Sequence, residues 1–400
     1  MINLSAIFTI CLILFLNIES SEEVGITIIE SAVAKGAVCL DGSPPAYQLD
    51  KGFGDGVNNW LVHIQGGGWC HTIEDCVYRK TMDNGLGSSK LMPELYFSGI
   101  LSNKADQNPN FYNWNRVYMR YCDGSSFTGD VDEVDTVNNL YFRGARVFTA
   151  IVEELMSIGM KDAQNALLSG CSAGGLASIL NCDKFRGFFP SSTRVKCVPD
   201  AGYFAHVKDL SGEYRFEQYY DKVVTLHGSA KNLPSGCTSS MKPSLCFYPQ
   251  YAMQYIKTPI FVVNSAYDTW QVFNILASYE ADPNGEFTKC KNDLKECSAT
   301  QRQRLQGDQP EIHVYNLEKL ARDDFRSDFL GTLSVVTNSS TKGMFVNTCY
   351  THCETDQTIW FEKPTSKLED KTMAEGVGDW FYDKYMFQGV DNQQVDPHYC

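Results

Sequence analysis

Short apolar segments alternate with helical patterns along most of this chain. The clearest apolar segments are residues 60–65, 116–122, 165–169 and 259–264, and each is followed by a loop with polar or glycine residues. Apolar runs of this length between helical patterns are typical of buried strands in a mainly parallel sheet. In such a sheet the loops beyond the carboxyl ends of the strands form the ligand crevice. The pattern therefore predicts an α/β fold whose functional residues lie in those loops.

The pattern between the strands predicts helices that flank the sheet. Residues 136–159 carry apolar positions at helical spacing, and Gly159 is suited to end that helix. Residues 281–311 are polar and contain cysteine, which indicates an insertion outside the sheet or a small separate domain. A chain of 400 residues with 43% hydrophobic content can bury a large core as one domain. We therefore expect a single catalytic domain over residues 21–400.

The N-terminus has the pattern of a secretory signal peptide. An apolar run at residues 6–16 precedes small and acidic residues, which predicts a signal peptide over residues 1–20 with cleavage near Ser20. A membrane span needs about 18 apolar residues, so an uncleaved anchor is the weaker alternative and no membrane association is expected after removal. In an exported protein, Asn338 in Asn-Ser-Ser is a predicted glycosylation site.

The cysteine content fits export. The chain has fifteen cysteines, and loss of Cys11 with the signal peptide leaves fourteen, an even number that predicts a disulfide-rich protein. Cys70 and Cys76 are candidates to close a short loop. Residues 349–353, Cys-Tyr-Thr-His-Cys, could suggest a metal cluster, but no second ligand pair stands at zinc spacing. We therefore expect disulfides and no metal.

The formal net charge is -14 and the sequence has no basic run. A field of this sign repels nucleic acid and anionic lipid, so neither is an expected partner.

The strongest local motif is Gly-Cys-Ser-Ala-Gly at residues 170–174, which follows a predicted strand and precedes a helical pattern. This is the context of the nucleophile elbow of α/β-hydrolases, where glycines permit a sharp, strained turn that exposes the serine hydroxyl at a helix N-terminus. The motif predicts Ser172 as the nucleophile and directs the Ala173 N–H at the developing oxyanion. Cys171 is better explained as a structural or disulfide cysteine.

A second motif, Gly-Gly-Gly-Trp-Cys at residues 66–70, follows an early predicted strand. It resembles the glycine-rich oxyanion loop of esterases, in which backbone N–H groups approach the oxyanion without hindrance from a Cβ atom. An ordinary turn is the alternative, but the position upstream of the elbow favours the functional interpretation. His63 precedes the serine, the wrong order for a catalytic histidine in this fold.

In this fold the catalytic acid follows a late strand and precedes the histidine. Asp268 lies in the loop just after the apolar segment at residues 259–264. The same position suits a helix N-cap, so both roles stay open from the residues alone. Asp200 is the next carboxylate to consider as the acid.

Three histidines follow Asp268: His313, His352 and His398. His352 comes after a short apolar run and beside Cys353, where a disulfide could hold its loop. His313 lies in an alternating segment typical of an ordinary strand, and His398 is close to the C-terminus, where chains fray. The pattern therefore predicts His352 as the base.

These motifs together resemble the pectin acetylesterase family of plants, which is related to the animal Notum carboxylesterases. The stretches that match cover most of the chain and are residues 37–44, 66–70, 120–124, 170–175, 200–204, 232–234, 266–271 and 352–353. The resemblance assigns the catalytic triad to Ser172, Asp268 and His352. It assigns the oxyanion donors to Gly68, Trp69 and Ala173, and it pairs Cys39 with Cys122.

The resemblance implies a secreted serine carboxylesterase. Its triad chemistry needs no cofactor, and we expect a monomer. Its expected substrate is acetylated pectin, homogalacturonan or rhamnogalacturonan, in the plant cell wall, from which it would release acetate. The acidic net charge favours a heavily esterified, less anionic pectin. One alternative is a Notum-like esterase for longer acyl chains, which requires a deep apolar pocket beside the serine. Another is a secreted binding protein with an inactive site.

Overall fold

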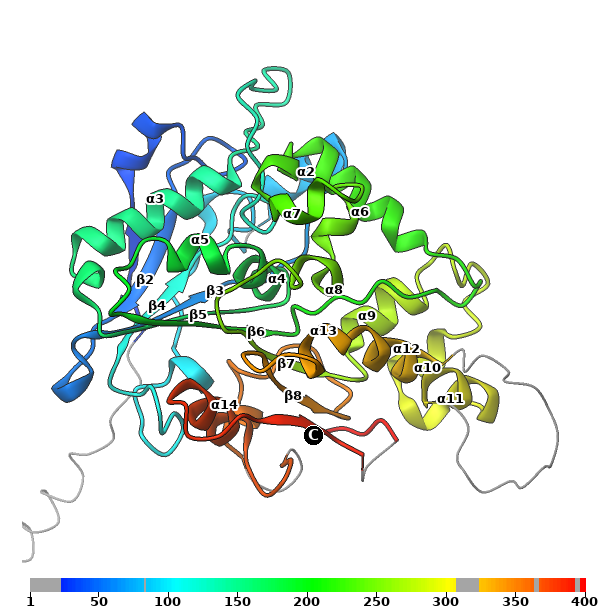
Figure 1. The fold of residues 1–400 in the computed structure, drawn as a ribbon. Coiled ribbons are helices and arrows are strands. Elements are labelled where there is room, and N and C mark those ends of the chain that lie inside the picture. The colour runs from blue at the N-terminus through cyan, green and yellow to red at the C-terminus, as the bar shows by residue number, and fades with distance from the viewer. Residues whose placement is uncertain (1–22, 83, 307–323, 363–366, 393–395) are drawn as a thin grey trace, which may run out of the picture.

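A nine-stranded sheet runs through the protein (Figure 1). The computed structural model describes residues 23–82, 84–306, 324–362, 367–392 and 396–400, so the predicted signal peptide and His313 lie outside the described residues. The strand order is β1-β2-β4-β3-β5-β6-β7-β8-β9; β2 is antiparallel to β1 and β4, and all other pairs are parallel. The strands are β1 (Ile26–Ile28), β2 (Ala46–Asp50), β3 (Asn59–Ile64), β4 (Asn115–Met119), β5 (Asn165–Cys171), β6 (Arg194–Asp200), β7 (Phe261–Ser265), β8 (Gly343–Asn347) and β9 (Gln388–Val390).

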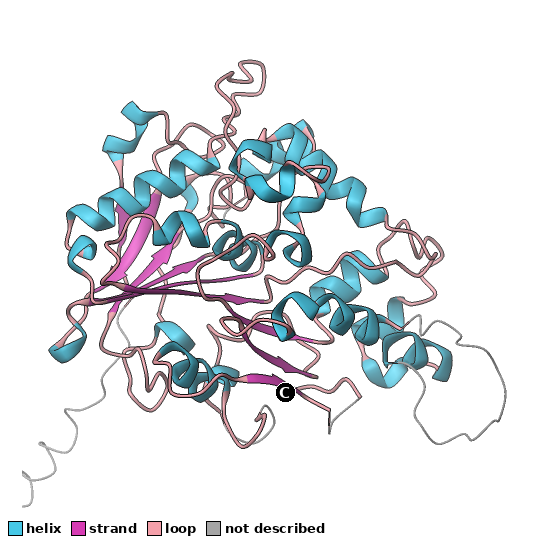
Figure 2. Cartoon of the chain, in the orientation of Figure 1, coloured by secondary structure: helices cyan, strands magenta, loops and turns pink. Residues whose placement is uncertain are grey.

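All four strands predicted from the sequence are confirmed, as β3, β4, β5 and β7. Helices cover both faces of the sheet (Figure 2), with α3 and α4 on one face and α14 on the other (Figure 1). The helices are α2 (Ile73–Lys80), α3 (Gly144–Ser157), α4 (Ala173–Leu180), α5 (Cys182–Arg186), α6 (Arg215–Leu226), α7 (Ser235–Thr238), α8 (Pro249–Ala252), α9 (Thr269–Gln271), η8 (Val272–Leu276), α10 (Thr288–Asn292), α11 (Ala299–Gln306), α12 (Phe325–Thr332), α13 (Ser334–Thr337) and α14 (Met373–Phe381).

The strand side chains alternate between two apolar cores. In β3, Val62 and Ile64 belong to the core beneath α3 and α4, whereas Leu61 belongs to the core beneath α14. The same alternation separates Val262 from Phe261 in β7. Because successive strand side chains point to opposite faces, a strand covered on both faces needs apolar residues at consecutive positions. This explains why the sequence shows continuous apolar runs instead of a polar and apolar alternation.

The prediction of a helix from residue 136 is wrong at its start, because α3 begins only at Gly144. Asp135 accepts hydrogen bonds from the backbone N–H groups of Val137 and Asn138 and pairs with Leu140 in an isolated bridge. A carboxylate that binds nearby backbone donors competes with helix formation, so this segment forms a turn. Leu140 is buried in a small separate apolar cluster, which accounts for its misleading apolar position.

The cysteines of the described chain form seven disulfides. The pairs are Cys39–Cys122, Cys70–Cys76, Cys171–Cys353, Cys182–Cys197, Cys237–Cys246, Cys290–Cys297 and Cys349–Cys400. The predicted insertion contains α10 and α11, which follow β7 and precede β8 in the chain and lie outside the sheet.

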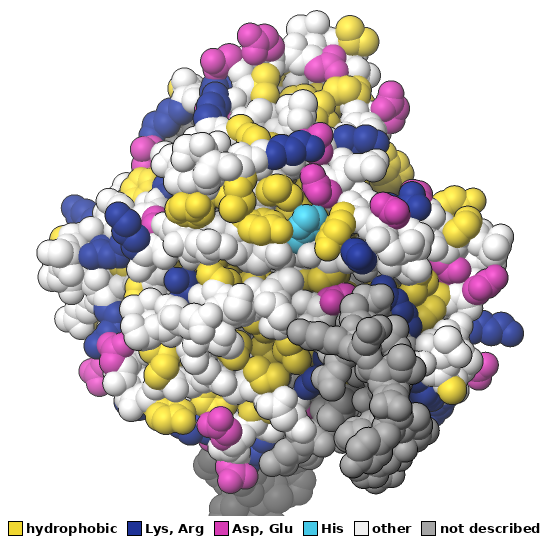
Figure 3. All heavy atoms as spheres, turned by 45° about the vertical axis from the view of Figure 1, so that its right-hand side comes forward, with side chains coloured by type: hydrophobic (Ala, Val, Ile, Leu, Met, Phe, Trp, Pro, Cys, Tyr) yellow, Lys and Arg dark blue, Asp and Glu magenta, His cyan; other side chains and the backbone are white. Residues whose placement is uncertain are grey.

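Basic and acidic side chains are interspersed over the face shown in Figure 3. Within the described parts of the chain, every helix is too short or too polar to cross a bilayer.

The Cys182–Cys197 disulfide provides a test of this framework, because it joins α5 to β6 and both sulfur atoms are buried away from the predicted catalytic residues. A loop of this length is expected to stabilise the fold by about 3 kcal/mol. We predict that the double variant Cys182→Ala/Cys197→Ala unfolds at lower denaturant concentration, with a free energy of unfolding about 2–4 kcal/mol smaller. An unchanged denaturation midpoint would show that this link adds nothing to the folded state.

Candidate active site

Ser172 lies at the tight turn between β5 and α4. Its backbone has φ 59° and ψ −126°, a strained conformation for a residue other than glycine. Two bonds fix the turn: the Ser172 N–H donates to the Asp200 carbonyl at 2.9 Å, and the Ser172 carbonyl accepts from the Leu176 N–H at 2.9 Å. A Cβ atom on Gly174 would collide with the backbone of Ile64. The glycines of the motif are therefore required by the close packing of β3, β5 and α4.

Asp268 and His352 come from the ends of neighbouring strands, β7 and β8, and meet directly. Nδ1 of His352 donates to Oδ2 of Asp268 at 2.7 Å, and the carboxylate is only 1% exposed. The other oxygen, Oδ1, accepts from the backbone N–H of Gln271 at 2.9 Å and caps α9. One oxygen of Asp268 thus contacts the imidazole, as the predicted catalytic acid would, and the other caps α9.

The second ring nitrogen of His352 is available for chemistry. Nε2 is buried and has no hydrogen-bond partner among the described residues. Burial lowers the pKa of His352, but the charge and hydrogen bond of Asp268, with the charges of Asp200 and Asp356, outweigh it and raise the pKa above its ordinary value. Such a ring accepts a proton at Nε2 readily while Asp268 fixes its orientation.

A disulfide joins the two halves of the site. Cys171 directly precedes Ser172 and bonds to Cys353, which directly follows His352. A ring nitrogen of His352 lies within 4.8 Å of both sulfur atoms, so the imidazole is beside the elbow that carries Ser172. Because both sulfur atoms are in a disulfide, this group offers no thiolate to a metal ion.

The loop that contains Gly68 and Trp69 has four successive carbonyl groups held by side-chain donors. Tyr121 donates its hydroxyl to the Gly68 carbonyl at 2.8 Å, and Tyr219 donates its hydroxyl to the Trp69 carbonyl at 3.0 Å. The two flanking bonds run from Arg79 Nη1 to the Gly67 carbonyl and from His227 Nε2 to the Cys70 carbonyl.

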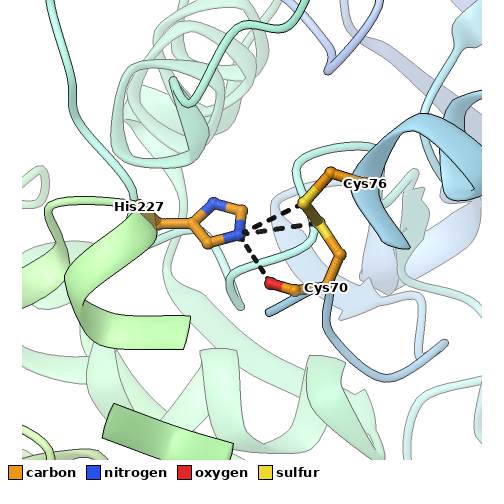
Figure 4. A group of neighbouring side chains, drawn as sticks. All are labelled: Cys70, Cys76 and His227. Carbon is orange, nitrogen blue, oxygen red and sulfur yellow. Dashed lines mark hydrogen bonds between the residues drawn. A yellow bond between two sulfur atoms is a disulfide. The ribbon is translucent and has the colours of Figure 1, made fainter. Parts of the chain in front are cut away.

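His227 illustrates how firmly this loop is held. Its Nε2 donates to the Cys70 carbonyl at 2.9 Å and lies against the Cys70–Cys76 disulfide (Figure 4). Burial lowers the pKa of His227 to about 4, so the ring is neutral at ordinary pH and can keep its proton on Nε2 for this bond.

These bonds leave the donors of the loop free. The N–H groups of Gly68, Trp69 and Ala173 donate to no other described residue. The Trp69 indole donates to Ser126 Oγ at 2.7 Å, and Ser126 donates in turn to the Ala173 carbonyl at 2.7 Å. The loop is therefore connected to the first residue of α4, and its free N–H groups fit the role predicted for an oxyanion hole.

Aromatic rings surround the Trp69 indole. Their centroids lie 4.9–6.4 Å from that of Trp69, and the rings are those of Phe204, Tyr219, Tyr220, Phe247 and Trp270. Because these side chains pack edge to face around the indole, protein fills the space around the Trp69 ring.

Asp200 has a role that the sequence did not predict. Its Oδ2 accepts from the N–H of Glu354 and the N–H of Thr355, both at 2.7 Å, and from Thr355 Oγ1 at 2.8 Å. Burial raises the pKa of the Asp200 and Glu354 carboxyls, and the Asp200 charge adds to the shift at Glu354. Asp200 thus binds the loop that carries His352, while its backbone carbonyl accepts from Ser172.

His63 and His398, two other histidines of the described residues, make their contacts with residues other than Asp268. His63 lies within β3, where Nδ1 forms a hydrogen bond with Ser169 Oγ at 3.2 Å, and burial lowers its pKa to about 4. His398 pairs with Cys349 in an isolated bridge close to the C-terminus.

Comparison with known proteins identifies the family. The Pectinacetylesterase family model matches residues 18–400. Pectin acetylesterase 11 of Arabidopsis thaliana is 50% identical over 382 residues, covering 95% of this chain and 93% of that protein. Pectin acetylesterase 5 of the same plant is 41% identical, covering 94% of this chain and 84% of that protein.

A solved structure of the Wnt deacylase Notum from Drosophila superimposes with a TM-score of 0.73 and 21% identity, covering 94% of this chain and 98% of that one. At this identity the likeness concerns the fold, and it confirms the α/β-hydrolase-like architecture predicted from the sequence. On the family match and the plant relatives, this chain belongs to the pectinacetylesterase family.

Proposed function

We propose that this protein hydrolyses acetyl esters of pectin, with Ser172 as nucleophile, His352 as base and Asp268 as the acid that orients it. The observation that carries the proposal is the 2.7 Å hydrogen bond from His352 Nδ1 to Asp268. The other ring nitrogen, Nε2, is buried and has no hydrogen-bond partner among the described residues. The loop of His352 is linked by a disulfide to Cys171, which directly precedes Ser172. Membership of the pectinacetylesterase family supports the substrate class.

The arrangement accounts for each proton in the reaction. His352 Nε2 takes the proton of Ser172 as Oγ attacks the acetyl carbonyl, and the N–H groups of Gly68, Trp69 and Ala173 stabilise the oxyanion. The imidazolium then gives its proton to the departing sugar oxygen, and the acetyl group stays on the serine. Water, deprotonated by His352, attacks the acetyl-serine, and acetate leaves as Ser172 regains its proton.

The N-terminal sequence, the cysteine content and the net charge support a proposal for where the enzyme acts. We propose that the chain is exported to the plant cell wall after cleavage near Ser20 and acts as a monomeric single domain over residues 21–400 without a cofactor. The exposed position of Asn338 supports its glycosylation. The net charge of -14 favours pectin with esterified carboxyl groups.

The surroundings of Trp69 support a short acyl group. A long acyl chain needs an apolar cavity beside the nucleophile, and here aromatic rings occupy the volume around the Trp69 indole. An acetyl group requires no such cavity. This packing favours acetyl esters over the longer acyl chains of a Notum-like activity.

Ser172→Ala tests the proposed nucleophile. The Ser172 hydroxyl makes no hydrogen bond to another described residue, so its loss should not weaken the fold. We predict that kcat for acetate release from acetylated pectin falls by about 10⁶-fold while the thermal midpoint stays within a few degrees. Near-normal turnover would remove Ser172 from the mechanism, and a collapsed midpoint would be visible in the same measurement.

Asp268→Asn separates catalysis from capping, because asparagine still accepts the Gln271 N–H but does not stabilise an imidazolium. We predict a loss in kcat of up to about 10⁴-fold with little change in the free energy of unfolding.

The pH dependence gives a second measurement. In the wild-type enzyme the rate falls as pH drops through the raised pKa of His352, since the base becomes protonated. In the variant that pKa falls, so the acidic limb of the kcat/KM profile moves to lower pH.

Asp293→Asn is the matched control, because Asp293 caps a short helical turn with the same carboxylate-to-N–H bond at 3.0 Å. It should change neither kcat nor the pH profile. Equal kinetic losses in the two variants would contradict a special role for Asp268.

Acyl-chain length tests the filled volume around Trp69. We predict that kcat/KM for p-nitrophenyl esters falls at least about tenfold from acetate to octanoate, because each added methylene meets close-packed aromatic rings or protrudes into water. Faster hydrolysis of octanoate than of acetate would instead favour a lipid-directed esterase.

A further inference from the structure

A cavity of about 460 Å³ opens between α6 and the segment that starts at α9 and continues through η8. From α6 it is lined at positions i, i+3, i+4 and i+7, which share one face of a helix, by Arg215, Gln218, Tyr219 and Lys222. From the facing segment it is lined by Trp270, Phe273 and Asn274. Both helical segments contribute aromatic rings and an amide to this space, and α6 adds two basic side chains.

The cavity adjoins the candidate active site through Trp270. This residue follows Asp268 by two positions, and its ring centroid lies 6.3 Å from that of His352 and 5.6 Å from that of Trp69. Tyr219 also belongs to both places, since it lines the cavity and donates its hydroxyl to the Trp69 carbonyl. If one sugar unit of a polysaccharide lies at Ser172, a neighbouring unit of the same chain can reach this cavity.

The side chains around the cavity are suited to a sugar. Tyr279 is 79% exposed and has no ring or hydrogen-bond partner among the described residues, so its ring is accessible to a ligand. Lys222 is exposed and forms no ion pair with a described residue, whereas Asp209 neutralises Arg215 through a 3.0 Å contact. Of the residues that the structure describes, Glu280 is the one carboxylate that lines the cavity.

Resting on the proposed function, we propose that this cavity is a subsite for a uronate unit of the polysaccharide, adjacent to the acetylated sugar. The apolar face of the sugar ring packs on Tyr279 or on the other aromatic side chains that line the cavity. The Lys222 ammonium pairs with the uronate carboxylate, and Gln218 supplies amide hydrogen bonds to ring hydroxyls. The subsite would anchor an anionic sugar locally on a protein whose overall charge is negative.

Binding of an oligogalacturonate without acetyl groups, measured by calorimetry, tests the subsite without any turnover. We expect Lys222→Gln and Tyr279→Ala each to weaken this binding about fivefold. In kinetics, each should lower the ratio of kcat/KM on acetylated pectin to kcat/KM on p-nitrophenyl acetate by about the same factor. The controls are Lys161→Gln, the same charge change at an exposed lysine near the end of α3, and Tyr385→Ala, an exposed tyrosine beside β9.

A fully methyl-esterified oligomer separates the two contributions. Its binding should be insensitive to Lys222→Gln, because it has no carboxylate, and still sensitive to Tyr279→Ala. Oligogalacturonate binding within twofold of wild type in both variants, or equal losses in the controls, would overturn the subsite. Failure of the proposed function would look different: the wild-type protein would release no acetate from pectin, whether or not it bound the oligomer.

Discussion

The strained turn at Ser172 is the constraint on which the rest of the site depends. A serine with φ 59° persists only if the surrounding structure leaves it no alternative. Here β5 enters the turn from the centre of the sheet, α4 leaves it, and the Asp200 carbonyl at the end of β6 holds its N–H. Glycines allow these backbones to approach, as Gly174 does against Ile64. The serine is thus positioned by three neighbouring elements of the core and does not depend on a flexible loop.

His352, by contrast, lies on a loop. One disulfide and two sets of hydrogen bonds hold that loop to the same core. Cys353 is bonded to Cys171, the Asp200 carboxylate accepts from residues 354 and 355, and Asp268 binds the ring itself. Two of these contacts end on residues next to Ser172 or bonded to it: Cys171 precedes Ser172 in the chain, and the Asp200 carbonyl accepts from the Ser172 N–H. A displacement of either half of the site would therefore have to break a disulfide or leave a buried carboxylate unpaired, which is costly.

Sequence patterns predicted the parts of this structure that local chemistry determines. The four strands, the elbow around Ser172 and the loop around Gly68 depend on neighbouring residues, and the order along the chain directed attention to Asp268 and His352. The start of α3 was missed because a single side chain, Asp135, diverts the backbone into a turn. The ties of the Gly68 loop could not be predicted: Tyr219 and His227 reach it from about 150 residues away, and no local pattern records such a contact.

An acetyl group is too small to supply most of the binding free energy of the substrate, so contacts with the sugar units have to supply it. Burying one methyl group yields on the order of 1 kcal/mol, whereas micromolar affinity requires about 8 kcal/mol. Aromatic rings already occupy the space around the Trp69 indole. Trp270 stands between this filled region and the open cavity along α6, with one side toward His352. With the proposed subsite, the sugars that surround the ester supply the selectivity, and the open cavity along α6 leaves room for one of them.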